Sequence, residues 1–262
     1  MFKKPFTLCL AVLCLALAVP AFAQQVKSSF FQLTVYTLKD KAGEALLDQY
    51  LQSAYLPALH RAGIGKVGVF KTATTGNDAP ADSKLYVFIP FKSGEQFLKL
   101  EKKLEKDKQY QAAAKTYLDA TPAHAPYARF ETILMEAFTG MPGIAIPQLK
   151  SAPAERIYEL RSYEAATEKL HLNKVAMFNN GEIDIFKKLG FNAIFYGRVI
   201  AGSKLPNLMY MTSFENKAER DAHWKAFGSD PDWKKLSAMP EYANNFLRAD
   251  VYLLHPTAYS DL

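Results

Sequence analysis

The feature of this chain that most constrains its fold is a pattern that occurs twice. Residues Phe91–Lys115 read FKSGEQFLKLEKKLEKDKQYQAAAK, and residues Phe214–Ala238 read FENKAERDAHWKAFGSDPDWKKLSA. The two stretches align without a gap at an offset of 123 residues, which places Tyr110 on Trp233. Because an internal repeat implies two copies of one supersecondary unit, the architecture must be built from that unit.

The correspondence continues on both sides of this pattern. A short apolar, strand-like run ends each time at the start of the pattern: KLYVFIPF at Lys84–Phe91 and NLMYMTSF at Asn207–Phe214. Further upstream each half has a strand, a helix that ends in glycine and a second strand, and each half closes with another strand, RFETILMEAF or NFLRADVYLL. Both halves therefore read strand, helix, strand, strand, helix, strand, which is the ferredoxin-like plan.

These units divide the chain after its N-terminal segment. The first unit covers residues 28–138 and the second covers residues 155–258. Between them, TGMPGIAIPQLKSAPA contains three prolines and two glycines, so residues 139–154 are predicted to be a linker. We expect an α+β fold in which two tandem ferredoxin-like βαββαβ units bring their open sheet faces together, the intramolecular version of a dimeric α/β-barrel.

Several residues indicate where the helices begin, bend and end. Gly63 and Gly190 follow helical stretches and suit the left-handed conformation that caps a helix. Pro57 lies inside the first helical stretch and is expected to kink it. Asp230 followed by Pro231 is a typical cap and first helical position, so the second copy of the pattern should stop and restart there. The apolar stripe that supports the first helix consists of Leu47, Tyr50, Leu51, Ala54, Ala58 and Ala62.

The N-terminus has the parts of a secretory signal peptide. Lys3 and Lys4 precede the apolar run Leu8–Val19, and Ala21-Phe22-Ala23 follows with small residues at the positions that cleavage requires. We expect residues 1–23 to be removed after Ala23 and the protein to be periplasmic or secreted. The apolar run is shorter than the about 20 residues that cross a bilayer, so no membrane span is expected.

Composition excludes several classes of site. Both cysteines, Cys9 and Cys14, lie inside the predicted leader, which leaves the mature chain without a thiol. No histidine pair has the spacing of a zinc site, so no metal is expected. The glycine-rich GIGKVG at Gly63–Gly68 follows a helix, whereas a phosphate-binding loop follows a strand and precedes a helix, so no other cofactor is expected either. Without Lys3 and Lys4 the formal charge falls from +6 to +4, and interspersed charges argue against nucleic-acid binding.

Two stretches of the second half carry a family resemblance. They are RIYELRSY at Arg156–Tyr163 and SFENKAERDAHWKAFGSDPDWKKL at Ser213–Leu236. The first is similar to the opening strand, and the second to the strand-to-helix segment, of the NIPSNAP family. The resemblance covers Glu155 to Pro256 and reaches the first half only through the repeat. It implies a dimeric α/β-barrel fold, a group that includes cofactor-free monooxygenases, but it implies no activity.

Alternation along the strands predicts which side chains of the second half line the barrel. In the last strand we expect Leu247, Val251 and their apolar neighbours Ala249 and Leu253 to face the helices. The opposite face then collects polar groups, which are a pocket for a small anion or aromatic ligand or else ion pairs that lock the two sheets in register. The candidate ligand-binding residues are Glu159, Arg161, Tyr163, Tyr196, Arg198, Tyr210, Arg248 and Asp250.

Three functions remain open from the sequence. The first is binding of a small molecule or a protein partner, by a monomer with a pseudo-dimeric core or by a homodimer. The second is a cofactor-free, monooxygenase- or isomerase-like enzyme for a small aromatic or acidic metabolite, with Glu159 or Asp250 as base and Arg161 or Arg248 as anion stabiliser. The third is a purely structural protein with an exposed apolar patch.

Both tryptophans lie in the second copy of the repeated pattern. Because large aromatic side chains dominate the cores between helices and sheets, Trp224 and Trp233 are expected to pack on the sheet rather than to form a partner surface. Of the histidines, His223 beside Trp224 is the first that we would test by mutation.

Overall fold

A computed structural model describes residues 29–73 and 83–262. The predicted leader, residues 1–23, lies outside the described residues. Within the described part, no helix combines the length and the apolar character that a membrane crossing requires.

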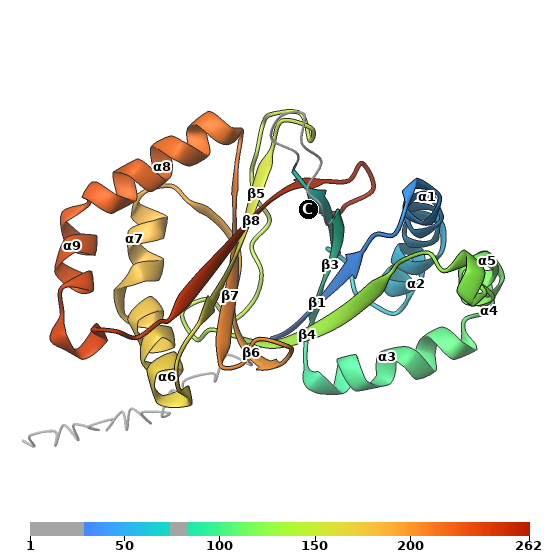
Figure 1. The fold of residues 1–262 in the computed structure, drawn as a ribbon, viewed down its shortest axis with the longest axis horizontal. Helices are drawn as coiled ribbons and strands as arrows, with labels where there is room; N and C mark the ends of the chain where they lie inside the picture. Colours follow the sequence, from blue (N-terminus) through green and yellow to red (C-terminus); the bar gives the residue numbers. More distant parts are fainter. Residues whose placement is uncertain (1–28, 74–82) are drawn as a thin grey trace, which may run out of the picture.

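Eight strands of the described chain close into one barrel (Figure 1). They are β1 (Phe30–Thr37), β2 (Gly68–Thr72), β3 (Lys84–Phe91), β4 (Arg129–Ala137), β5 (Ile157–Glu164), β6 (Asn192–Ala201), β7 (Asn207–Phe214) and β8 (Arg248–Pro256). Their order around the barrel is β1-β3-β2-β8-β5-β7-β6-β4, and every neighbouring pair is antiparallel. The predicted barrel is therefore confirmed, and its closure leaves no open sheet edge.

Helices flank the barrel on two opposite sides. Figure 1 shows the helices of the first half on one side and those of the second half on the other, with the strands between them. Those of the first half are α1 (Lys41–Tyr50), α2 (Leu56–Arg61), α3 (Gly94–Lys106), α4 (Lys108–Ala113) and α5 (Lys115–Leu118). Those of the second half are α6 (Glu168–Met177), α7 (Ile183–Lys188), α8 (Lys217–Ser229) and α9 (Pro231–Ser237).

Aromatic side chains from both halves fill the inside of the barrel. The rings of Phe88 and Phe195 stack with centroids 4.5 Å apart and planes 12° apart, and Phe31 lies 5.5 Å from Phe195. All three side chains are fully buried. Because burying one such side chain contributes about 1.5–3 kcal/mol, the two halves share a core that neither would keep alone.

The local signals for the helix ends are confirmed. Gly63 and Gly190 have φ angles of 83° and 76°, the left-handed conformation expected after a helix. Asp230 caps α9, since its carboxylate accepts hydrogen bonds from two backbone amides of that helix. Around Pro57 the irregularity is a π-helical turn, Leu51–Tyr55, which joins α1 to α2 just before the proline removes a backbone donor.

The segment after β8 crosses back to the first half. The Asp261 carboxylate accepts hydrogen bonds from the backbone amides of Lys66 and Val67, at 3.1 and 2.8 Å, and lies 2.8 Å from Nε2 of His60. Leu262 packs into the barrel core. The two halves are thus connected by hydrogen bonds from the Asp261 carboxylate to backbone amides of the first half, as well as by the shared core.

Residues 139–154, all of them described, connect β4 to β5 without a helix or strand. The backbone amides of Lys150 and Ser151 donate hydrogen bonds of 2.9 and 2.7 Å to the Glu215 carboxylate. These amides hold the pKa of Glu215 at about 2, well below its usual value. The connection is therefore held against the second half at the start of α8.

Candidate functional site at one end of the barrel

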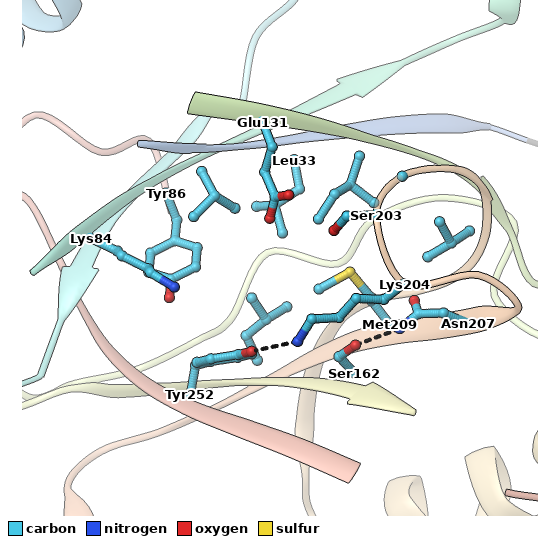
Figure 2. A pocket seen from close by; sticks show the side chains of 15 residues that line it. Leu33, Lys84, Tyr86, Glu131, Ser162, Ser203, Lys204, Asn207, Met209 and Tyr252 are labelled. Carbon is cyan, nitrogen blue, oxygen red and sulfur yellow. Dashed lines mark hydrogen bonds between the residues drawn. The ribbon is translucent and has the colours of Figure 1, made fainter. Parts of the chain in front are cut away.

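A small cavity opens at the end of the barrel where β3 and β7 begin (Figure 2). Its volume is about 70 Å³, which is room for several water molecules or a compact ligand. Polar side chains gather at its outer part, as Figure 2 shows for Lys84, Glu131, Lys204 and Tyr252. The apolar wall consists of Leu33, Val35, Ile133, Leu160, Val199 and Met209.

Lys204, in the loop between β6 and β7, extends across this cavity (Figure 2). Its ammonium donates hydrogen bonds to the Asp250 carboxylate and, at 3.2 Å, to the hydroxyl of Tyr252. The Tyr252 hydroxyl in turn donates to Asp250 at 3.3 Å. The bond from Lys204 holds the pKa of Asp250 below its usual value. A carboxylate, an ammonium and a phenol are thus connected at the rim.

Deeper in the cavity, Asn207 and Ser162 form a buried polar pair. Asn207 is 2 % exposed, and its amide nitrogen donates to the Ser162 hydroxyl. The amide oxygen of Asn207 has no hydrogen-bond partner among residues 29–73 and 83–262, and Figure 2 shows it on the side of Lys204. Leaving such an acceptor unpaired costs about 1–3 kcal/mol, so a ligand group that donates a hydrogen bond to it would be favoured.

The opposite wall of the cavity comes from the first half. Glu131 of β4 is exposed at the rim, and Tyr86 of β3 is almost fully buried with its ring centroid 6.2 Å from that of Tyr252. Burial raises the pKa of the Tyr86 phenol, and the neighbouring Tyr252 adds to the rise. Tyr86 is therefore neutral at physiological pH and can donate a proton in a hydrogen bond.

Six of the eight predicted site residues face the helices, so their predicted orientation was wrong. On β5 the side chains in the barrel core are Tyr158 and Leu160, which belong to the opposite alternation. Val199 likewise lies in the barrel core, and Met209 and Met211 do so on β7. The six residues on the helix side are Glu159, Arg161, Tyr163, Tyr196, Arg198 and Tyr210.

The physical reason for this inversion is that β5 and β7 are buried on both faces. Burial then no longer marks the inside, because the face of β5 that carries Glu159 and Arg161 is covered as well as the face that carries Tyr158 and Leu160. A barrel packed with phenylalanine and methionine has no room for charges. The helix side can accept them, since α8 brings Arg220 as a counter-ion to Glu159.

Strand β8 follows the predicted alternation more closely. Tyr252 lines the cavity, Asp250 accepts a hydrogen bond from the cavity-lining Lys204, and Arg248 reaches the Asp250 carboxylate at 3.4 Å. The face that was expected to meet the helices is exposed instead, since Leu247 is 71 % and Val251 is 43 % exposed. None of the predicted set lines the cavity itself, and Asp250 is connected to it through the hydrogen bond from Lys204.

Glu159 is the centre of a charged cluster beneath α8. Its fully buried carboxylate accepts hydrogen bonds from Nε of Arg161 and Nε of Arg220, both at 2.6 Å, and from Nε1 of Trp224 at 2.7 Å. Burial alone would raise the pKa of Glu159. The bonds from Arg220 and the charge of Arg161 outweigh it, so the pKa lies below its usual value.

The cluster continues from Arg161 into the aromatic layer. The Arg161 guanidinium lies 3.7 Å from the ring centroid of Trp224 and donates to the Tyr163 hydroxyl at 3.0 Å. The hydroxyls of Tyr163 and Tyr210 are 2.9 Å apart. The groups in this chain pair with one another, as the ion-pair alternative expected, but they join the sheet to its helices rather than one sheet to the other.

A second buried ion pair was missed by the sequence analysis. Nζ of Lys174 on α6 donates to Glu182 at 2.9 Å, and both side chains are at most 4 % exposed. Burial raises the pKa of Glu182, and the Lys174 ammonium opposes the rise. The signal in the sequence was a lysine three residues from both His171 and Met177, on the buried face of its helix.

The two tryptophans pack in this aromatic layer, as expected. Trp224 meets Phe191 edge-on at 5.0 Å, and Trp233 lies 4.4 Å from Phe227. The His223 ring packs on Phe191 and its Nδ1 lies 2.9 Å from a backbone carbonyl of α8, which is a packing role. In the described part of the chain no group of side chains is suited to hold a metal ion.

A closed eight-stranded barrel with helices on two sides and a small cavity at one end defines a class of α/β-barrel proteins. Solved structures share this fold along most of the chain. A protein of Fusobacterium nucleatum subsp. nucleatum, provisionally named a monooxygenase, is 9% identical and has a TM-score of 0.56, covering 87% of this chain and 92% of its own. A protein of Lactobacillus acidophilus with the same provisional name is 10% identical, with a TM-score of 0.55 and coverages of 87% and 94%.

The second half also matches a sequence family. Residues 158–261 match the model of the NIPSNAP family, so this part of the chain is a NIPSNAP domain. A NIPSNAP family protein from Agrobacterium tumefaciens is 19% identical and covers 45% of this chain and 98% of its own, with a TM-score of 0.37. No curated protein sequence matches the chain.

Proposed function

We propose that this protein binds a small molecule in the cavity at the end of the barrel. The observation that carries the proposal is the buried, unpaired amide oxygen of Asn207, which lines the cavity beside Ser162. A bound hydroxyl or amine would supply the hydrogen bond that this acceptor lacks. The exposed polar rim would then contact the part of the ligand nearest to solvent.

The shape and lining of the cavity restrict the ligand. The volume of about 70 Å³ favours a compact molecule. Its body should be apolar, because Leu33, Ile133 and Leu160 form the wall. One end should carry an O–H or N–H donor for Asn207, and the other end should be able to contact the Lys204 ammonium. Small phenols, alcohols and hydroxy acids meet these conditions.

Thermal-shift screening of small phenols, alcohols and hydroxy acids tests this proposal. A ligand present at 100 times its Kd stabilises the folded state by about 2.7 kcal/mol, which raises Tm measurably. Asn207→Leu, which removes the acceptor while keeping the branched shape of the side chain, should abolish the shift. The matched control is Gln109→Leu, an amide removed from the exposed face of α4, which should keep it. An equal shift in wild type and Asn207→Leu would contradict binding at this cavity.

Cofactor-free catalysis is a second candidate function. The connected Lys204, Asp250 and Tyr252 can pass a proton to or from a bound phenol or acid, with Asp250 as the base. The two solved proteins that are provisionally named monooxygenases share the fold of this chain, and their support for this candidate function extends no further than the fold. Oxygen uptake in the presence of each binding compound would test it, and Tyr252→Phe should lower turnover more than it weakens binding. Absence of uptake with every compound that binds would leave binding as the function.

We also propose that the barrel consists of two ferredoxin-like units in one chain. Support comes from the strand order, since β4-β1-β3-β2 and β8-β5-β7-β6 are the same sequence of positions in each half. The NIPSNAP domain coincides with the second of these units. Export to the periplasm or medium is proposed from the leader at residues 1–23, and N-terminal sequencing of the purified protein would test cleavage after Ala23.

A further inference from the structure

Residues of α2 and α3 line a basic groove. Both helices lie on the side of the barrel that carries the helices of the first half (Figure 1). The volume of the groove is about 460 Å³, within the range of small-molecule sites. Ala58, Ala62 and Leu104 contribute its apolar part. The cations that line the groove are Arg61, Lys99, Lys102, Lys103 and Lys106, against one carboxylate, Asp107.

Local contacts hold part of this groove in place. Arg61 of α2 forms an ion pair with Asp107 at 2.7 Å, and Asp107 also caps α4 by accepting from a backbone amide. Nζ of Lys103 donates to the backbone carbonyl of Ala62 at 3.3 Å, at the end of α2. Lys102 and Lys106 are exposed, and within the described residues no hydrogen bond or ion pair engages either side chain. Two ammonium groups thus remain available in a groove whose walls are fixed.

The spacing of the lysines on α3 produces like-charge repulsion along one face of the helix. Lys99, Lys102, Lys103 and Lys106 are spaced by three or four residues, so they lie side by side on one face of the helix. Like charges at these spacings destabilise a helix, and of these four lysines only Lys99 has an ion-pair partner in α3, Glu95 at 2.6 Å. The repeat provides an internal comparison, because the equivalent positions of α8 are Ala222, Lys225, Ala226 and Ser229. The basic face is therefore absent from the second copy of the same helix.

We propose that this groove binds a multivalent anion with clustered phosphate groups. Such a ligand would relieve the repulsion among the lysines and would place several charges near Arg61, whose planar guanidinium suits phosphate oxygens. The same chemistry is offered by a free polyphosphate and by the headgroups of an anionic lipid surface. The site lies outside the barrel, so it is independent of the cavity at Asn207.

Calorimetric titration with tripolyphosphate tests the proposal, and flotation with vesicles of equal parts phosphatidylcholine and phosphatidylserine distinguishes the two sources. The test variant is the double substitution Lys102→Glu and Lys106→Glu. The matched control is Lys225→Glu and Lys234→Glu on α8 and α9, which changes the net charge equally at exposed lysines of the second half. Circular dichroism verifies that both variants are folded.

We expect wild type and control to bind alike and the test variant to bind at least about 25-fold more weakly, since each of the two lysines contributes about a factor of five near an anionic surface. Affinity should also fall with added salt. Binding of tripolyphosphate alone would identify a free anion as the ligand, and binding of vesicles alone would identify lipid headgroups. Failure to bind either probe, or equal loss in both variants, would overturn the proposal.

Discussion

The indole Nε1 of Trp224 donates a hydrogen bond of 2.7 Å to the buried carboxylate of Glu159. This bond joins α8 to β5 at the point where Arg161 and Arg220 also reach that carboxylate. The tryptophan side chain therefore has two roles, since its ring packs against the aromatic layer and its nitrogen helps to satisfy a buried charge. The strand and the helix are held in one relative position by a single acidic side chain.

The first prediction concerns the loss of that charge. Glu159→Gln keeps the shape of the side chain but leaves the two arginines beside a neutral amide in a buried site. Removing one partner of a buried ion pair costs about 3–5 kcal/mol, so we expect the free energy of unfolding to fall by that amount. Urea unfolding followed by circular dichroism measures it. The control is Glu101→Gln on the exposed side of α3, which should change the free energy by less than about 0.5 kcal/mol. A loss under about 1 kcal/mol for Glu159→Gln, the scale of an exposed ion pair, would mean that the cluster is solvated.

The second prediction concerns pH. The pKa of Glu159 lies below its usual value in the folded protein, so its contribution to stability is present above the unfolded-state pKa and is lost as pH falls through the folded-state pKa. We expect the difference in free energy of unfolding between wild type and Glu159→Gln to be constant above about pH 6 and to shrink below about pH 4.5. Urea titrations across this range measure the difference. A difference that grows on acidification would contradict the assigned direction.

The third prediction concerns the shared barrel core. Phe195 stacks on Phe88 of the other half, and Phe195→Ala should lower the free energy of unfolding by about 3–5 kcal/mol. Because this contact joins the halves, the whole domain should unfold in one transition. Both tryptophans lie in the second half, so their fluorescence reports that half while far-ultraviolet circular dichroism reports both. The two signals should have the same urea midpoint in wild type.

A fluorescence midpoint that differs from the circular dichroism midpoint would show that the halves unfold separately. The matched control for Phe195→Ala is Phe246→Ala, since Phe246 is 51 % exposed and lies outside the barrel. This control should lower stability much less than the core substitution. An equal loss in both variants would contradict the role assigned to the shared core.

Local and repeated patterns made the architecture predictable. The duplicated pattern and its flanking strands are sufficient to predict eight strands in a barrel, because each copy alone would expose an apolar sheet face. Gly63, Gly190 and Asp230 marked helix ends correctly, since each acts through its own backbone or a neighbouring amide. These signals depend on residues close together in the sequence, which is why the sequence carries them.

The candidate site was less predictable. Asp250 was predicted as a site residue and is hydrogen-bonded to Lys204 of the cavity, but Lys204 itself lies in a short loop with no periodicity to orient it. Asn207 at the start of β7 gave no signal of its own, because the lack of a partner for its amide oxygen appears only when the neighbouring strands are in place. A site formed by strands from both halves depends on contacts between residues far apart in the chain.

The sequence by itself determined the order of the strands and helices, the helix caps and the need for two sheets to cover one another. The tertiary structure alone decided which face of β5, β6 and β7 turned inward. Both faces of β5 and β7 are covered, so the polar face of β5 did not have to be the barrel lining, and the choice followed from the space available. The barrel accepted the closely packed apolar side chains, while the layer beneath α8 accepted Glu159 because Arg161, Arg220 and Trp224 could satisfy its charge there.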